Sequence, residues 1–180
     1  LDTSFGSDGI VTTDFGSDDD YGRGVVVDAD GRIIAAGYSY NGSDNDFAVV
    51  RYNTDGSLDT TALRKAAAAL LNKGVGKLVC VHFPEGGYAL LPSGEEFWQS
   101  SLKLPQKYIK GAAGAGDAFC AGMLMGIHEG WDLKRSLFTG VCAAAANLSD
   151  PTCAGGMKRL STVLALAKKY KPRASIQPKR

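Results

Sequence analysis

The chain has 180 residues, of which 44% are hydrophobic and 22% charged, an ordinary composition for a globular protein. It contains no apolar run of about eighteen residues and no basic segment leading into an apolar one, so neither a membrane span nor a signal peptide is expected, and the expected location is cytoplasmic. The net charge of +1 hides a sharp division. Residues 1–60 carry 12 Asp and 3 Arg, a charge of −9, whereas residues 61–180 carry 17 Lys and Arg against 7 acidic residues, a charge of +10. Two segments of different origin are therefore expected, with a boundary near Thr60.

The first sixty residues have the pattern of short β-strands joined by turns rich in Gly, Asp, Asn and Ser. An Asp-Ala-Asp-Gly turn at 28–31 predicts a hairpin, and Asn53-Thr54-Asp55-Gly56 predicts a second turn. The segment contains no Glu, which argues against an EF-hand, and its Asp residues are interpreted as turn formers. The expected strands are Ile10–Phe15, Arg23–Asp28, Arg32–Tyr38 and Asp46–Tyr52.

An internal repeat supports one β-propeller blade in this segment. Leu1-Asp2-Thr3-Ser4 returns as Leu58-Asp59-Thr60-Thr61 after 57 residues, and a repeat of that length built from short strands is typical of a propeller. Together with the turn at 28–31 and the stretch from Phe47 to Asp59, it resembles one unit of the delta-60 bacterial repeat, a β-propeller family. The resemblance implies a structural or interaction module without catalytic residues. A single blade would expose sheet edges and an apolar face.

From Thr61 the pattern changes to that of an α/β unit. We expect a helix that Gly74 closes, three strands, three further helices of which two are capped by Asp132 and Ser161, and a frayed basic tail from Lys171. The expected helices are Ala62–Asn72, 117–129, 133–148 and 162–170, and the expected strands are Lys77–His82, Tyr88–Leu91 and Glu95–Leu102.

The four cysteines and two histidines of this segment do not have the spacing of a metal site. Without a C-x-x-C pair, the cysteines are expected to be reduced and in the core rather than in disulfides or zinc sites, and no metal ligands are assigned. Basic residues are scattered, which favours a solvated surface over nucleic-acid binding. The cysteines are Cys80, Cys120, Cys142 and Cys153.

The residues with the clearest chemical pattern are those of the loop at 111–117. Gly111, Gly114 and Gly116 allow a tight turn directly before a helix, whose free amides and positive end suit a phosphate. Asp117 at the helix start could take a proton from a hydroxyl that attacks this phosphate. Spacing alone is equally consistent with Asp117 as an ordinary helix cap. A P-loop lacks its Gly-Lys-Ser/Thr here, and a dinucleotide fingerprint lacks a small residue where Phe119 stands.

The run from Gly114 to Phe119, Gly-Ala-Gly-Asp-Ala-Phe, together with Gly122, resembles the second signature of the ribokinase/PfkB carbohydrate kinase family. The resemblance covers residues 62 to about 170 and implies the C-terminal half of a ribokinase-like α/β sandwich. It also implies transfer of the ATP γ-phosphate to a sugar hydroxyl, with Mg²⁺ as the second cofactor. Asp117 would be the catalytic base, and phosphate would bind at Gly114, Ala115 and Gly116, with the amides of Ala115, Gly116 and Asp117 forming an anion hole. The nucleotide would contact Pro84, Glu85, Gly86, Gly87 and Cys142.

Three departures from the family pattern limit these expectations. Pro84 stands where a Gly usually opens the nucleotide turn. Residues 111–113 replace an Asp-Thr that many members use for a monovalent cation, so potassium activation is not expected. The N-terminal half of the kinase has no counterpart in residues 1–60.

The expected domains are a propeller-type repeat at 1–60, a kinase C-terminal region at 61–170 and a basic tail at 171–180. The expected function is that of an ATP-dependent carbohydrate kinase, a phosphotransferase with an alcohol acceptor, present as an incomplete domain. Its expected partners are a small-molecule carbohydrate and either a missing N-terminal kinase half or neighbouring propeller repeats, without nucleic acid or membrane. The alternative is a non-catalytic propeller-repeat interaction fragment that carries an inert kinase remnant.

Overall fold

The computed structural model describes residues 2–6, 9–13, 20–40 and 45–177. The chain divides into two compact units, Leu1–Arg64 and Lys65–Arg180, which are described separately below. Within the described ranges, no helix is both long enough and apolar enough to cross a membrane.

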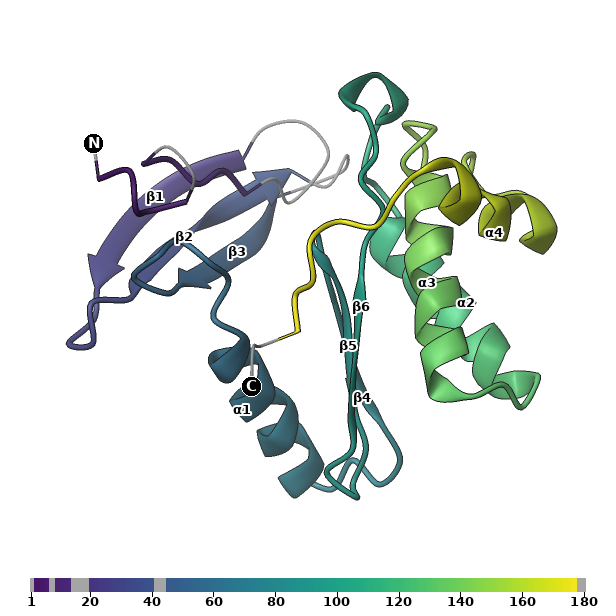
Figure 1. The fold of residues 1–180 in the computed structure, drawn as a ribbon, viewed down its shortest axis with the longest axis horizontal. Helices are drawn as coiled ribbons and strands as arrows, with labels where there is room; N and C mark the ends of the chain where they lie inside the picture. Colours follow the sequence, from purple (N-terminus) through teal and green to yellow (C-terminus); the bar gives the residue numbers. More distant parts are fainter. Residues whose placement is uncertain (1, 7–8, 14–19, 41–44, 178–180) are drawn as a thin grey trace. The chain divides into compact units, whose positions relative to one another are not determined.

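The first unit is a three-stranded antiparallel sheet in the order β1-β2-β3, as the turn signals predicted (Figure 1). The predicted β1–β2 hairpin is confirmed: Gly31 has a φ of 77°, and its amide donates to the carbonyl of Asp28 at 2.9 Å. The predicted strand at 10–15 is wrong for residues 10–13, which are not extended into a sheet, and its last two residues lie outside the described ranges. The strands are β1 Asp20–Val27, β2 Ile33–Tyr40 and β3 Asn45–Tyr52.

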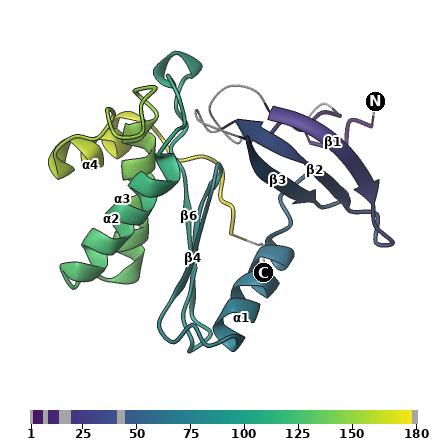
Figure 2. The same cartoon turned by 180° about the vertical axis from the view of Figure 1, so that it is seen from behind.

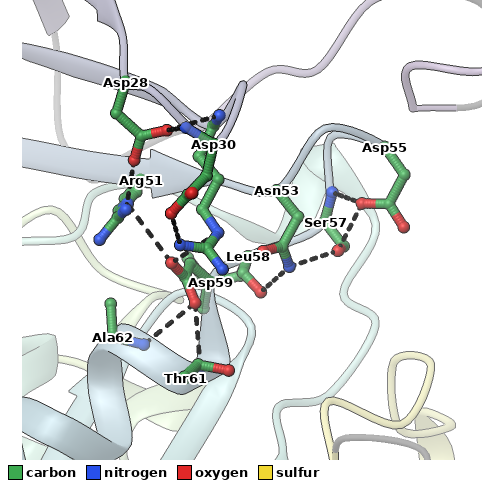
Figure 3. Close-up of polar contacts among 11 residues, drawn as sticks. Asp28, Asp30, Arg51, Asn53, Asp55, Ser57, Leu58, Asp59, Thr61 and Ala62 are labelled. Atoms are coloured by element: carbon green, nitrogen blue, oxygen red, sulfur yellow. Dashed lines mark hydrogen bonds and ion pairs between the residues drawn. The ribbon is translucent and has the colours of Figure 1, made fainter.

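A buried carboxylate, that of Asp59, lies between the end of this sheet and the start of the following helix (Figure 3). Asp59 is 4% exposed, and one of its oxygens accepts the backbone amides of Thr61 and Ala62, both at 3.0 Å, at the start of the next helix. Its other oxygen lies 3.4 Å from Nε of Arg51 and 3.8 Å from Nε of Arg32. Asp59 therefore joins the last two strands of the sheet to the first turn of the following helix.

The other aspartates of the first unit support their interpretation as turn formers. Asp28 accepts the backbone amides of Asp30 and Arg32 at 3.0 and 2.9 Å, and its second oxygen contacts Arg51. The Arg32 amide, aided by the Arg51 guanidinium, lowers the pKa of Asp28. Asp55 accepts both the amide and the hydroxyl of Ser57. Each carboxylate thus satisfies backbone donors within a turn.

Strand β1 leaves apolar side chains uncovered, as expected for a single blade. All eight of its residues are exposed, and Val25, Val26 and Val27 are 67%, 59% and 66% exposed. Because consecutive side chains point to opposite faces of a strand, both faces are open at this edge.

The second unit contains a three-stranded antiparallel sheet in the order β4-β5-β6 with helices α2 and α3 on one side of it (Figures 1 and 2). The predicted helices and strands of this segment are confirmed, with ends that shift by a few residues. They are α1 Thr60–Asn72, which begins in the first unit, β4 Val79–Phe83, β5 Gly86–Leu90, β6 Glu96–Ser100, α2 Ala115–His128, α3 Leu133–Asn147 and α4 Leu160–Lys169, with a short 3₁₀ turn at Gln106–Tyr108.

The two predicted N-caps have different outcomes. Asp132 caps α3 by accepting the amide of Arg135 at 2.7 Å, as predicted. Ser161 does not cap α4, because the helix begins at Leu160, two residues earlier than predicted. Its first bonds run from the amides of Thr162 and Val163 to the carbonyl of Arg159, which holds the N-cap position.

Helices α2 and α3 approach closely because small residues face each other. A Cβ at Gly122 would lie 2.9 Å from the Cα of Gly140, and one at Gly126 would lie 2.5 Å from Oγ of Ser136. These pairs are four residues apart on each helix, so they lie on one face of it. α3 is almost wholly buried and forms the centre of the unit.

The first residues of the tail, from Lys171 to Ala174, are hydrogen-bonded to the chain around residues 100–103. Leu102 and Pro172 form an antiparallel bridge, and the amide of Arg173 donates to the carbonyl of Ser101 at 2.8 Å. The segment therefore runs alongside the end of β6, drawn in yellow in Figure 1.

We predict that Asp59→Ala destabilises the first unit by about 2–4 kcal/mol, because it removes a helix cap and leaves two partly buried arginines without their shared carboxylate. Native-state hydrogen exchange of amides in β2 and β3 measures this loss. The matched control is Asp30→Ala, which removes only the exposed ion pair with Arg32 and should change stability by less than about 0.5 kcal/mol. Equal effects of the two substitutions would contradict the central role of Asp59.

Candidate active site

The glycine-rich loop opens directly into helix α2. Gly114 is the residue before the helix and has a φ of 76°, a left-handed conformation that favours Gly. A Cβ there would lie 2.1 Å from the carbonyl oxygen of Cys153. Gly116 is different, because a Cβ there would meet no described atom within 4 Å. Gly114 is therefore needed for the loop to pack against Cys153, whereas Gly116 leaves open space at the end of the helix.

Two backbone amides at this helix end belong to exposed residues. The first bond closing the helix runs from the amide of Ala118 to the carbonyl of Gly114 at 2.8 Å, so the amides of Gly116 and Asp117 precede it. Both residues are exposed, and within the described part of the chain no acceptor is recorded for either amide. The amide of Ala115, expected to be a third donor, already donates to the carbonyl of Ala112 at 3.0 Å. The candidate anion hole therefore has two free donors, the amides of Gly116 and Asp117.

Asp117 lies in the first turn of α2 with its residue exposed. A carboxylate is favoured at this position by the positive end of the helix dipole. No side chain caps the helix, so the alternative in which Asp117 is the N-cap is wrong: Gly114 holds that position. The carboxylate and the two free amides therefore occupy the same helix end.

The end of helix α3 is hydrogen-bonded to the glycine-rich loop. The side-chain amide of Asn147 donates to the carbonyl of Ala113 at 2.7 Å, and the amide of Lys110 donates to Leu148 at 2.8 Å. Asn147 is fully buried, and its Oδ1 has no recorded partner among the described residues. Sequence reasoning missed this residue, although an Asn that follows four alanines in a buried helix was a usable signal.

The hairpin carrying the predicted nucleotide turn is joined to α2 through Phe119. The His82 ring stacks on Phe119 with centroids 4.5 Å apart and an interplanar angle of 18°. A Cβ at Gly87 would lie 2.9 Å from the Phe119 ring. Phe119, which made the dinucleotide fingerprint fit poorly, thus places the β4–β5 hairpin against the signature helix.

The turn at residues 84–87 is held by Ser101. Its hydroxyl donates to the carbonyl of Pro84 at 2.7 Å and its amide donates to the carbonyl of Glu85 at 2.8 Å. A Cβ at Gly86 would lie 2.1 Å from the carbonyl of Gln99, so Gly86 is required by strand packing. No sequence pattern pointed to Ser101.

The cysteines divide into two groups, and all four are free thiols. Cys80 and Cys142 are in or beside the core, where burial raises the pKa of their thiols to about 12 and about 11, with a smaller contribution of Cys120 at Cys80. Cys120 and Cys153 are exposed, so the expectation of a core position is wrong for them. Because the Cys142 side chain is buried, it could influence a nucleotide only through the packing of α3.

The described residues contain no group of three or more His, Cys, Asp or Glu side chains placed to hold a metal ion. The open helix end fits a phosphate group, and Mg²⁺ in such sites is held largely by the phosphates, water and one or two carboxylates. The arrangement is therefore that of an exposed helix N-terminus with a carboxylate beside it, in an α/β unit, and such a helix end can accept a phosphate.

Comparison with known proteins agrees with this class. The model of the pfkB family carbohydrate kinases matches residues 46–159, and the chain belongs to this family. A β-propeller domain of unknown function (DUF5122) matches residues 29–61. The two matches share residues 46–61. Residues 46–52 lie in β3, which pairs with β2, so the structure assigns this stretch to the propeller-type sheet.

Individual relatives match about half of the chain. The 5-dehydro-2-deoxygluconokinase of Shouchella clausii is 33% identical over 89 residues, which are 49% of this chain and 26% of that protein. The enzyme of the same name from Geobacillus thermodenitrificans is 29% identical over 86 residues, 48% of this chain and 25% of that protein. The chain thus spans about a quarter of the length of these relatives.

A solved structure shows the same fold. An apo crystal structure from E. coli, provisionally assigned as ribokinase II, superposes with a TM-score of 0.53 at 24% identity. The superposition covers 58% of this chain and 32% of that structure. The kinase part is thus a portion of the ribokinase-like α/β fold, and the N-terminal strands are consistent with a propeller-like segment.

The stack of the partly buried His82 on Phe119 predicts a pH-dependent stability. Burial lowers the pKa of His82 from 6.5 to about 4, so the unfolded state binds a proton more readily than the native state. The stabilisation is complete above the unfolded pKa and is lost as the pH falls from about 6.5 towards about 4. Between about pH 7.5 and pH 5, His82 should account for a loss of about 2 kcal/mol in unfolding free energy.

Urea unfolding followed by Trp fluorescence at the two pH values measures this loss. His82→Phe keeps an aromatic ring against Phe119 and should reduce the loss by about that amount. His128→Gln is the control, because His128 is exposed at the end of α2. The assignment is contradicted if His82→Phe retains the full pH dependence.

Proposed function

We propose that residues 61–170 form the phosphoryl-transfer half of an ATP-dependent carbohydrate kinase, preceded by a propeller-type repeat at 1–60 and followed by the tail at 171–180. The observation that carries the proposal is the helix end of α2, where the amides of Gly116 and Asp117 and the Asp117 carboxylate are exposed together. Family membership supports the same chemistry.

The residues of this chain would act as follows. Asp117 accepts the proton of an acceptor hydroxyl, and the freed oxygen forms the new bond to the transferring phosphorus. The amides of Gly116 and Asp117 donate to the phosphoryl oxygens as charge shifts towards the leaving group. Bound ATP with Mg²⁺ would supply the phosphoryl group and neutralise its charge, and ADP would leave. The turn at 84–87, held by Ser101, would lie along the nucleotide.

A small carbohydrate is the proposed acceptor. The two curated relatives are 5-dehydro-2-deoxygluconokinases, so 5-dehydro-2-deoxygluconate is the first acceptor to test. The matched stretch is only about a quarter of each relative. We therefore assign the residues that select the acceptor to the remaining three quarters of such a kinase.

The experiment is a graft of residues 61–170 into the Shouchella clausii enzyme in place of its matched stretch. The graft should transfer phosphate from ATP, and Asp117→Asn should lower kcat at least about 100-fold while leaving ATP affinity within about twofold, because general-base catalysis is typically worth that factor. Glu95→Gln, at the exposed turn between β5 and β6 and away from the nucleotide turn, is the control and leaves the base in place. A loss below about tenfold for Asp117→Asn would remove Asp117 from the role of base.

The alternative, a non-catalytic interaction fragment, has one favourable observation, the exposed valines of β1. A folded graft that binds ATP but transfers no phosphate would favour it. A graft that is active and depends on Asp117 would exclude an inert kinase remnant.

A further inference from the structure

The side chain of Asn147 bonds across to the glycine-rich loop, unlike two other buried polar side chains of α3. Ser136 and Thr139 donate to carbonyls four residues earlier in the chain, those of Asp132 and Arg135, both at 2.9 Å. Asn147 is 0% exposed, and its Nδ2 donates at 2.7 Å to a loop carbonyl 34 residues earlier. Its Oδ1 has no recorded partner among the described residues. Because a buried polar atom without a partner is unfavourable, the bond to the loop is what this side chain contributes.

The local sequence would allow helix α2 to begin one turn earlier than it does. In an α-helix each amide donates to the carbonyl four residues before it. In a longer helix the amide of Gly116 would therefore donate to Ala112. The amide of Asp117 would likewise donate to Ala113. Alanine is the residue most favourable to a helix, and both acceptor positions are alanines. Such an extension would use up both free donors of the candidate anion hole.

The loop instead forms a tight turn, after which the helix starts at Ala115. The amide of Ala115 donates to the carbonyl of Ala112 at 3.0 Å, and Gly114 has a φ of 76° and a ψ of 3°. These angles are those of the third residue of a type II turn, and they lie outside the right-handed helical region. The carbonyl of Ala112 is thus bonded within the turn. The carbonyl of Ala113, in the middle of the turn, is bonded to Asn147.

We propose that Asn147 is a positioning residue that keeps the candidate anion hole open. Its side-chain amide occupies the Ala113 carbonyl, which is the acceptor that the Asp117 amide would use in a longer helix. The same bond holds the central peptide of the type II turn. A type I turn differs by a rotation of that peptide and has nearly helical angles, and Gly114 permits both forms. The use of the two amides for phosphate rests on the proposed function, whereas the geometry of the loop does not.

Amide hydrogen exchange of the ¹⁵N-labelled 180-residue chain without ligand tests the geometry. In the unsubstituted chain the amides of Gly116 and Asp117 should exchange without protection. Asn147→Leu removes the donor at similar side-chain size and should slow both amides at least about tenfold, because they become bonded in a longer helix. Asn147→Ala, which continues the alanine run of α3, is the second variant in case the first does not fold. Protected amides in the unsubstituted chain, or unprotected amides in a folded variant, would overturn the proposal.

Ser149→Ala is the matched control. The Ser149 hydroxyl donates to the carbonyl of Ala146 at 2.8 Å, so this substitution removes a hydrogen bond at the end of α3 but none to the loop. It should leave exchange of the two amides within about twofold of the unsubstituted chain. A merely structural role of Asn147 would lower protection rather than raise it. Equal protection in Ser149→Ala and Asn147→Leu would overturn the specific role of Asn147.

Titration of the same chains with ATP and Mg²⁺ separates positioning from the proposed function. Asn147→Leu should weaken ATP binding at least about tenfold, since one hydrogen bond to a charged group is typically worth that factor. Unchanged ATP affinity in an Asn147→Leu chain with protected amides would overturn the positioning role and retain nucleotide binding. Absence of ATP binding in the unsubstituted chain, with the expected exchange result, rejects the proposed function and retains Asn147 as the residue that keeps the two amides free.

Discussion

The second unit depends on the packing of one aromatic ring into space that two glycines leave free. Gly87 and Gly140 both face Phe119, and a Cβ at either would lie 2.9 Å from an atom of that residue. Phe119 is two residues after Asp117, so the position of the ring sets the start of α2 relative to the β4–β5 hairpin. One hydrophobic contact therefore holds the candidate anion hole and the candidate nucleotide turn in a single unit.

The first unit uses charge rather than apolar packing for its main constraint. A nearly buried Asp59 compensates Arg51 and Arg32 and caps the first turn of α1. Such a group is stable only with all its partners present, because a buried charge without them is strongly unfavourable. The echo of Leu1-Asp2 at Leu58-Asp59 therefore has a structural meaning: Asp2 closes a local turn through Ser4, whereas Asp59 begins a helix.

Local signals predicted most of the fold, and packing decided the rest. The hairpin turn at 28–31, the helices and the Asp132 cap follow from glycines, capping residues and periodicity, which act over a few residues. The pairing of the tail beside β6 and the support of the loop by Asn147 depend on residues more than thirty positions apart. The loop at 111–117 was identifiable as a candidate phosphate site, but spacing could not show that the amide of Ala115 already donates to the carbonyl of Ala112 within the loop.

The central claim is that the start of α2 binds the phosphates of a nucleotide. Titration of the ¹⁵N-labelled 180-residue chain with ATP and Mg²⁺, followed by amide chemical shifts, tests it directly. The account predicts saturable shifts that are largest at the amides of Gly116 and Asp117. The change at Ala115 should be much smaller, because its amide already donates to the carbonyl of Ala112. Unchanged shifts at Gly116 and Asp117 at saturating ATP, or shifts confined to other parts of the chain, would contradict it.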